Sequence, residues 1–413
     1  MGRIGRRART DSVRVAALDV QHSHRRSAVV VGPVALPPLD ELTARLLAMA
    51  DSGPAARIAL QPSTAGTGWR FSPSALRRAV SATDHEPADP VELLTMLRQC
   101  PGDGLRILAA GDHLAIDFSH GLGEVPLLDM LVAVLLGAVD PRDDSVWAPY
   151  RRAAPPLVLA AARAIGRSPQ RLLPLWRQHR RNAGAPDTAV AGGSRPLVPS
   201  PATRVARIPA DVLTDLRRLR DSALPGVNMF AVQTCALHEA FAAAGLDVDP
   251  TVTVPFDVRR YLPDGHDTLA SFSAGLDFTL DGDDGPRRLQ AEMTAAARMA
   301  RPVANLVAGT VKTRAAMRSG RHAEPLLPDR PRLRLLHSSI GTVPRNPWAF
   351  SDPGRARILV ASDPAGPCGV TVTSATVTGA LWLTAEFHDT VFDAGKIAAA
   401  LASVPEQIRK LLG

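Results

Sequence analysis

Apolar and polar positions follow two periods along this chain, one typical of buried strands and the other of amphipathic helices. Residues 28–31 are all apolar and predict a buried strand. Residues 39–51 repeat apolar side chains at helical spacing directly after a pair of prolines, which predicts a helix that begins there. This succession of strands and helices is interrupted after about residue 140 and resumes near residue 202. The pattern predicts an α/β protein built from two halves.

Positions 104–136 contain the most informative pattern. The predicted strands 104–110 and 113–119 are joined by Gly111-Asp112, a dipeptide typical of hairpin turns. His120 follows the second strand, and a glycine-containing turn leads from it into an apolar helix over about residues 126–136. A histidine in such a turn projects into the cleft above the strand end, where neutral imidazole accepts a proton from a hydroxyl or amine. His120 is therefore the candidate catalytic base, with a purely structural histidine as the alternative.

The composition of successive segments predicts four parts. Residues 1–12 are rich in arginine and glycine, and we expect them to be disordered. Residues 13–181 form the expected N-terminal subdomain, which carries His120. Residues 182–201 are expected to be an irregular linker, and residues 202–413 the C-terminal subdomain. Two subdomains also suit a chain of 413 residues.

Charge and cysteine content narrow the class of protein. The formal net charge is +8, and arginine supplies nearly all of the positive charge. Such a surface suits a coenzyme phosphate, an acidic carrier protein or a membrane. Nucleic acid is disfavoured, because aromatic residues are 4% of the chain and no zinc-finger or RNP-type motif is present. Cys235 and His238 are expected to pack in a helix core, so we predict no metal site.

The apolar segments do not predict a membrane span. The longest of them, residues 125–139, is too short to cross a bilayer and contains Asp129. The basic N-terminus is not followed by the apolar region of a signal peptide, and we expect a cytoplasmic protein. Arginines in residues 151–181 leave peripheral membrane contact open, although a solvated surface is the favoured interpretation.

The stretch 116–131 resembles the strand–histidine–turn–helix element of the thioester-dependent acyltransferase superfamily. That superfamily includes chloramphenicol acetyltransferase, condensation domains and wax ester synthases, and its signature is H-H-x-x-x-D-G. Alignment on the second histidine places His120 in the catalytic position and Ser119 in the first-histidine position. Glu124 stands in place of the aspartate and Val125 in place of the glycine, so the motif is degenerate. The resemblance implies that Glu124 is a structural carboxylate that pairs with an arginine.

A second segment, residues 252–262, resembles the "V-D-x-R" strand of the same superfamily. Asp257 and Arg259 occupy the matching places. By this resemblance Arg259 is the expected partner of Glu124, and Asp257 a positioning residue beside it. Such an ion pair would connect the catalytic turn to the second lobe.

A third segment, Leu336-His-Ser-Ser-Ile-Gly, resembles the "S-N-x-G" strand that faces the active-site channel of the superfamily. Ser338 and Ser339 are therefore candidate hydroxyl donors to a developing oxyanion, and Ser119 is a further candidate at the channel. The order of the matching segments extends the resemblance over about residues 13–413. Other histidines near the predicted strands are interpreted as incidental: His22, His24 and His388.

The resemblance implies a two-lobed chloramphenicol-acetyltransferase-like α/β fold, with pseudo-symmetric mixed-sheet subdomains in a V and a tunnel between them. It also implies an acyltransferase that moves an acyl group from a CoA or carrier-protein thioester to a hydroxyl or amine. No cofactor is expected beyond that acyl-CoA or acyl-carrier co-substrate. Two alternatives stay open: a degenerate relative that binds an acyl carrier or ligand without turnover, and a lipid-binding protein at a membrane surface.

Overall fold

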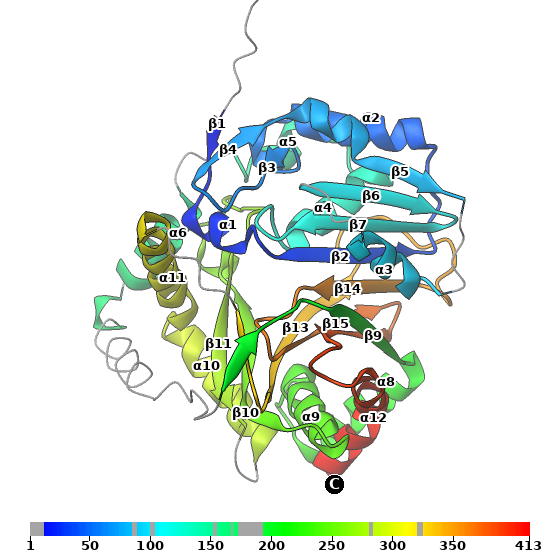
Figure 1. The fold of residues 1–413 in the computed structure, drawn as a ribbon, viewed down its shortest axis with the longest axis vertical. Coiled ribbons are helices and arrows are strands. Elements are labelled where there is room, and N and C mark those ends of the chain that lie inside the picture. Colours follow the sequence, from blue (N-terminus) through cyan, green and yellow to red (C-terminus); the bar gives the residue numbers. More distant parts are fainter. Residues whose placement is uncertain are drawn as a thin grey trace, which may run out of the picture.

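The computed structural model describes residues 12–84, 89–99, 104–151, 155–166, 168–171, 193–280, 284–319 and 325–413. It consists of two α/β lobes, each built on a mixed sheet, with the N-terminal sheet above the C-terminal sheet in Figure 1. This confirms the predicted fold class. Nearly all of the N-terminus predicted to be disordered (residues 1–12) and most of the predicted linker (residues 182–201) lie outside the described residues.

The N-terminal lobe has a five-stranded sheet in the order β14-β2-β7-β6-β5. The predicted hairpin is its β6–β7 pair, in which Ala110 lies opposite His113. Helices α2 and α4 pack on one face, and α3 contacts β2 and β7 through a separate apolar cluster. The elements are β2 (Arg26–Gly32), α2 (Leu39–Asp51), β5 (Val80–Thr83), α3 (Val91–Gln99), β6 (Leu105–Ala110), β7 (His113–Ser119), α4 (Val125–Leu135) and β14 (Arg357–Ser362).

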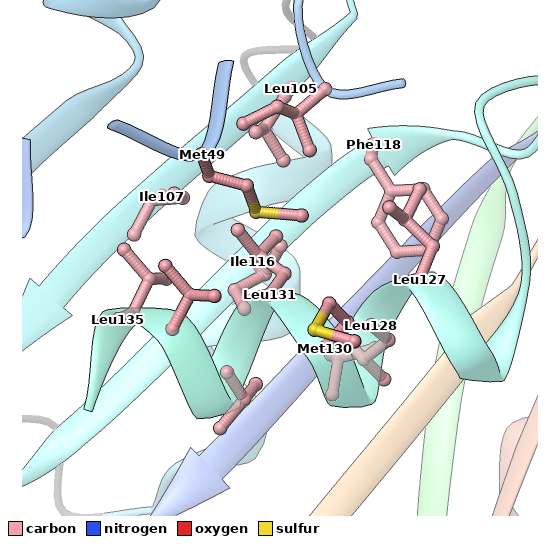
Figure 2. Close-up of a cluster of buried hydrophobic side chains, with 14 of the residues drawn as sticks. Met49, Leu105, Ile107, Ile116, Phe118, Leu127, Leu128, Met130, Leu131 and Leu135 are labelled. Carbon is pink, nitrogen blue, oxygen red and sulfur yellow. The ribbon is translucent and has the colours of Figure 1, made fainter. Parts of the chain in front are cut away.

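Packing of α4 against this sheet fixes the position of the turn that precedes it. Figure 2 shows Ile116 and Phe118 of β7 facing Leu127 and Leu131 of α4, with Met49 of α2 beside them. All five side chains are buried. Complete burial of an apolar side chain of this size stabilises the fold by about 1.5–3 kcal/mol. The helix is therefore held firmly, and so is the chain between β7 and α4.

The C-terminal lobe has a six-stranded sheet in the order β11-β10-β13-β15-β16-β9. Its core lies between one sheet face and the helices α8, α9, α10 and α12. The elements are β9 (Pro201–Ile208), α8 (Ala210–Ala223), α9 (Met229–Ala243), β10 (Val248–Asp257), β11 (Ser273–Thr279), α10 (Gly285–Arg298), β13 (Leu333–Val343), β15 (Gly369–Val377), β16 (Ala380–His388) and α12 (Ala394–Leu412).

Smaller elements surround the two lobes. Helix α11 packs against α1, β11 and α6, and the sequence pattern does not reveal it because only Pro302, Val303 and Leu306 of its residues are buried. A 3₁₀ turn, Pro73–Arg78, precedes β5. The other elements are β1 (Ser12–Arg14), α1 (Ala17–His22), β3 (Leu60–Gln61), β4 (Gly68–Phe71), α5 (Asp144–Trp147), α6 (Pro156–Ala161), β8 (Ser194–Pro196), α11 (Arg301–Ser319) and β12 (Leu326–Pro328).

Strand β14 crosses from the second half of the sequence into the first lobe. The division by sequence places residues 357–362 in the C-terminal subdomain, whereas they pair antiparallel with β2, with Ile358 opposite Val31. β14 also contacts β15 and β16 of the other sheet, so it lies where the two sheets meet. Pairing between strands far apart in sequence is a tertiary feature that the order of the elements does not reveal. Among the described residues, no helix is long and apolar enough to cross a membrane.

Candidate active site

His120 opens the turn between β7 and α4, and both lobes hold its backbone. Its N–H donates to the carbonyl of Arg25 at 2.7 Å, immediately before β2. Its carbonyl accepts a hydrogen bond of 2.7 Å from Ser271 Oγ, which belongs to the C-terminal lobe. The peptide units on either side of the imidazole are therefore fixed relative to both sheets.

The turn after His120 is confined on all sides. Arg57 Nη2 donates to the Gly121 carbonyl at 2.9 Å, Arg57 Nε donates to the Leu122 carbonyl, and the guanidinium is paired with buried Asp19 at 2.9 Å. A Cβ atom at Gly123 would collide with the Leu269 carbonyl and the Leu127 side chain. Close approach of neighbouring backbone therefore requires glycine here.

A single hydrogen bond determines the tautomer of His120. Nδ1 lies 3.1 Å from the Gly123 carbonyl oxygen, which can only accept, so Nδ1 carries the proton in the neutral ring. Nε2 is then the basic nitrogen. Burial lowers the pKa of His120 from its ordinary value; the charge of Arg25 acts in the same direction, and Glu124 opposes both. The imidazole is therefore neutral near pH 7 and able to accept a proton.

His120 lines a cavity of about 370 Å³ between the two sheets. Side chains alternate along strands, so β13 and β15 each send one set of side chains to the helix-covered core and the other to this cavity. On β15, Val370 and Val372 are in the core, while Thr371 and Thr373 line the cavity. Its apolar lining includes Val29, Phe118, Val125, Leu128, Leu336, Ile340 and Val360.

Glu124 and Arg259 lie together beside His120, as the sequence predicts. Arg259 Nη1 is 3.3 Å from Glu124 Oε2, and Ser273 Oγ donates to the same oxygen at 2.8 Å. Burial alone would raise the pKa of Glu124, but the charge of Arg259 and the hydrogen bonds from Ser273 outweigh it and hold the pKa below its ordinary value. Asp257 lies 3.0 Å from Arg259 Nη1 and is half-exposed at the cavity. Glu124 is therefore ionised, and Arg259 orients it.

The three serines proposed from the sequence have different surroundings. Ser338 lines the cavity on the strand face that carries Leu336 and Ile340. Ser339 contributes to the cavity but is exposed and also lines a depression of about 570 Å³ beside Arg260. Ser119 is buried, donates from Oγ to the Ser23 carbonyl at 3.0 Å, and is absent from the cavity lining. Ser119 therefore holds α1 against β7, and its expected place at the channel is wrong.

His22 is a cavity residue that the sequence analysis set aside as incidental. It ends α1, and its ring centroid lies 5.2 Å from that of His120. Burial lowers the pKa of His22 to about 3, with the neighbouring His120 acting in the same direction. The two rings therefore lie against each other as neutral groups, tilted by 56°. Nothing in the sequence pairs residue 22 with residue 120, because their contact depends on the β2–β7 pairing.

Arg25, Thr371 and Thr373 also line the cavity and were not predicted. The alternation Val370-Thr-Val-Thr was a usable signal, since it places two hydroxyl groups on one face of a strand. Arg25 had no such signal. Among the described residues, no group of three or more His, Cys, Asp or Glu side chains could hold a metal ion.

The two mixed sheets with a cavity between them define the chloramphenicol-acetyltransferase-like class of fold. The chain is similar over 97% of its length to TRI3 trichothecene 15-O-acetyltransferase from Fusarium sporotrichioides, with a TM-score of 0.65, 10% identity and 95% of that chain covered. It is similar to the first condensation domain of the CDA synthetase, with a TM-score of 0.55 and 15% identity over 97% of this chain and 96% of that one. The chain is also similar to polyketide synthase associated protein 5 from Mycobacterium tuberculosis, with a TM-score of 0.52 and 14% identity over 96% of this chain and 97% of that one.

These similarities confirm, at the level of the fold, the resemblance inferred from the sequence. Identities of 10–16% show a shared architecture and leave the reaction to be argued from the site. No protein-family model and no curated protein sequence matches the chain.

Proposed function

We propose that this protein is an acyltransferase that moves an acyl group from a thioester to a hydroxyl or amine, with His120 as the general base. One observation carries the proposal: a neutral imidazole lines the cavity between the lobes with Nδ1 engaged by Gly123 and Nε2 left as the basic atom. The fold shared with acetyltransferases and condensation domains supports the same class of reaction.

In the proposed reaction, His120 carries the proton from the acceptor to the leaving sulfur. Nε2 takes the proton from the acceptor hydroxyl or amine as its oxygen or nitrogen bonds to the thioester carbonyl carbon. The resulting tetrahedral oxyanion collapses, the C–S bond breaks, and the sulfur leaves with the proton that Nε2 has held. The products are the ester or amide and the free thiol, and the protein returns to its starting state.

Neighbouring groups have positioning roles in this proposal. The Ser338 hydroxyl is the candidate donor to the oxyanion, since it lies on the cavity-facing side of β13. Ser339 is the second candidate. Glu124 and Arg259 hold the turn that presents the imidazole, and the negative charge of Glu124 favours the transient imidazolium.

The donor in this proposal is a thioester of CoA or of a carrier protein, and no other cofactor is required. Similarity to condensation domains of peptide synthetases and to a polyketide-synthase-associated protein supports a carrier-borne donor. The proposed place of action is the cytoplasm. Of the segment considered for peripheral membrane contact, residues 151–181, the structure describes 151, 155–166 and 168–171.

The test is acceptor-dependent release of thiol from acyl-CoA and acyl-pantetheine donors by wild type and His120→Ala. General-base catalysis contributes about 10²–10⁴-fold, so the variant should lose at least about 100-fold in kcat/KM. His24→Ala is the matched control, because His24 is exposed and is not a cavity residue. Equal turnover by His120→Ala and wild type would refute the assignment. Donor binding without turnover by wild type would instead identify the non-catalytic relative.

A further inference from the structure

Arg25 differs from the other buried arginines near the two sheets. Four of them have carboxylate partners: Arg26 with Asp117, Arg57 with Asp19, Arg98 with Asp363 and Glu386, and Arg259 with Glu124. Arg25 Nη2 donates to the Asp363 backbone carbonyl at 2.6 Å, and its buried Nε has no hydrogen-bond partner among the described residues. Within the described part of the chain, Arg25 forms no ion pair.

The carboxylates nearest to Arg25 are already engaged. Asp363 accepts from the backbone N–H of Arg26 at 2.6 Å and pairs with Arg98. Glu386 pairs with Arg98 at 2.6 Å, and burial raises the pKa of Glu386 to about 7, so this carboxyl carries only part of a negative charge at neutral pH. Burial also lowers the pKa of Arg25. These observations describe a buried cation without full compensation, which is costly unless something neutralises it.

Arg25 faces the cavity that contains His120. It shares the lining with Ser27, Ser362 and Thr371, so this end of the cavity is polar. Arg25 and His120 line the same cavity, and the positive charge of Arg25 lowers the pKa of His120.

We propose that Arg25 binds a carboxylate of the acyl acceptor, which makes the acceptor a hydroxy acid or amino acid; this inference rests on the proposed acyltransferase function. A guanidinium matches a carboxylate with two parallel hydrogen bonds. The carboxylate end lies beside Arg25 and the nucleophile beside His120 Nε2. The hydrocarbon part of the acceptor lies against the apolar wall that includes Val29 and Leu128.

A phosphate of the donor does not fit this position. The pantetheine arm separates the phosphate of CoA or of a carrier from the thioester by a long chain. While the thioester carbon lies at His120, that phosphate is at the far end of the arm. The anion beside Arg25 therefore belongs to the acceptor.

The test is calorimetric binding of 3-hydroxyoctanoate and of its methyl ester, which differ in charge at the carboxyl end. Wild type should bind the acid about 10–100-fold more tightly than the ester, the range expected for hydrogen bonds to a charged group. Arg25→Gln should remove that preference and leave ester binding unchanged. Arg25→Lys should keep part of it, since lysine retains the charge without the planar fork. Arg217→Gln is the matched control, because Arg217 is exposed on α8.

The outcomes separate this inference from the proposed function. His120→Ala should lose turnover but keep the preference for the acid, so a failure of catalysis alone leaves the carboxylate site intact. If wild type does not prefer the acid, including the case in which neither compound binds, the inference is wrong. It is equally wrong if folded Arg25→Gln retains the preference. If Arg25→Gln does not fold, Arg25→Lys provides the test. A preference of Arg25→Lys for the acid over the ester equal to that of wild type would show that paired hydrogen bonds from Arg25 do not bind the carboxylate.

Discussion

Arg259 and Glu124 form an ion pair of 3.3 Å between the two lobes, next to the turn that carries His120. Each side chain is only 10–11% exposed. The guanidinium also donates to the carbonyl oxygens of Thr268 at 2.9 Å and Ala270 at 2.5 Å. Arg259 therefore joins a loop of the C-terminal lobe to the first turn of α4.

Removal of Arg259 should cost more stability than removal of the charge on its partner. Arg259→Ala leaves Glu124 ionised and buried, with Ser273 as its remaining hydrogen-bond partner among the described residues. Loss of one member of a buried pair destabilises by about 3–5 kcal/mol. Glu124→Gln leaves Arg259 with Asp257, at 3.0 Å, and should cost about 1–3 kcal/mol. Urea unfolding at pH 7 measures both. The reverse order would show that Asp257 does not compensate Arg259.

Glu386 should make the stability of the protein fall as pH rises. Its ordinary pKa is 4.5, and burial raises the folded-state pKa to about 7 despite the charge of Arg98. Between these values the folded state binds the proton more tightly than the unfolded state, so the free energy of unfolding decreases with pH and levels off above about 7. Each pH unit between the unfolded and folded pKa values corresponds to about 1.4 kcal/mol, which predicts a total decrease of a few kcal/mol.

Glu386→Gln should remove this component, because glutamine resembles the protonated carboxyl at every pH. Urea unfolding at pH 5, 6, 7 and 8 should therefore give a shallower decline for the variant, which should be the more stable protein at pH 8. Glu41→Gln, on an exposed pair with Arg45, is the control and should follow wild type. Parallel curves for Glu386→Gln and wild type would contradict the raised pKa.

The fall of kcat/KM at acidic pH should follow the pKa of His120. A general base is active when neutral, so activity is constant above its pKa and falls as pH drops through it. Burial lowers this pKa, so the fall should lie below the ordinary value of 6.5. Glu124 raises the pKa, and Glu124→Gln should move the fall to still lower pH. A fall that moved to higher pH in the variant would contradict this electrostatic relationship.

Gly123→Ala should displace the turn that carries His120. The added methyl group would meet the Leu269 carbonyl, which is backbone and cannot rotate away. We expect a stability loss of about 1–3 kcal/mol from overpacking, together with a larger loss of kcat than of substrate binding. Gly66→Ala is the control, since a methyl group there meets nothing within 4 Å. Unchanged kcat in Gly123→Ala would show that the turn tolerates displacement.

The sequence by itself determined several local elements and the turn that carries His120. Helix α2 begins and ends at the predicted residues, and the β6–β7 hairpin lies where Gly111-Asp112 predicted it. These elements follow from periodicity and turn chemistry, which act between neighbours in the chain. The partnership of Glu124 with Arg259 was inferred from family resemblance, and the structure shows that contact.

Only the tertiary structure decided which distant side chains share the cavity. The contact of His22 with His120, the absence of Ser119 from the cavity lining and the place of β14 in the N-terminal sheet all depend on strand pairing across the chain. The unpaired charge of Arg25 is likewise visible only once Asp363 and Glu386 are seen to be engaged by Arg98. Strand pairing and side-chain burial depend on packing between residues far apart in the chain. The local sequence pattern therefore does not predict them.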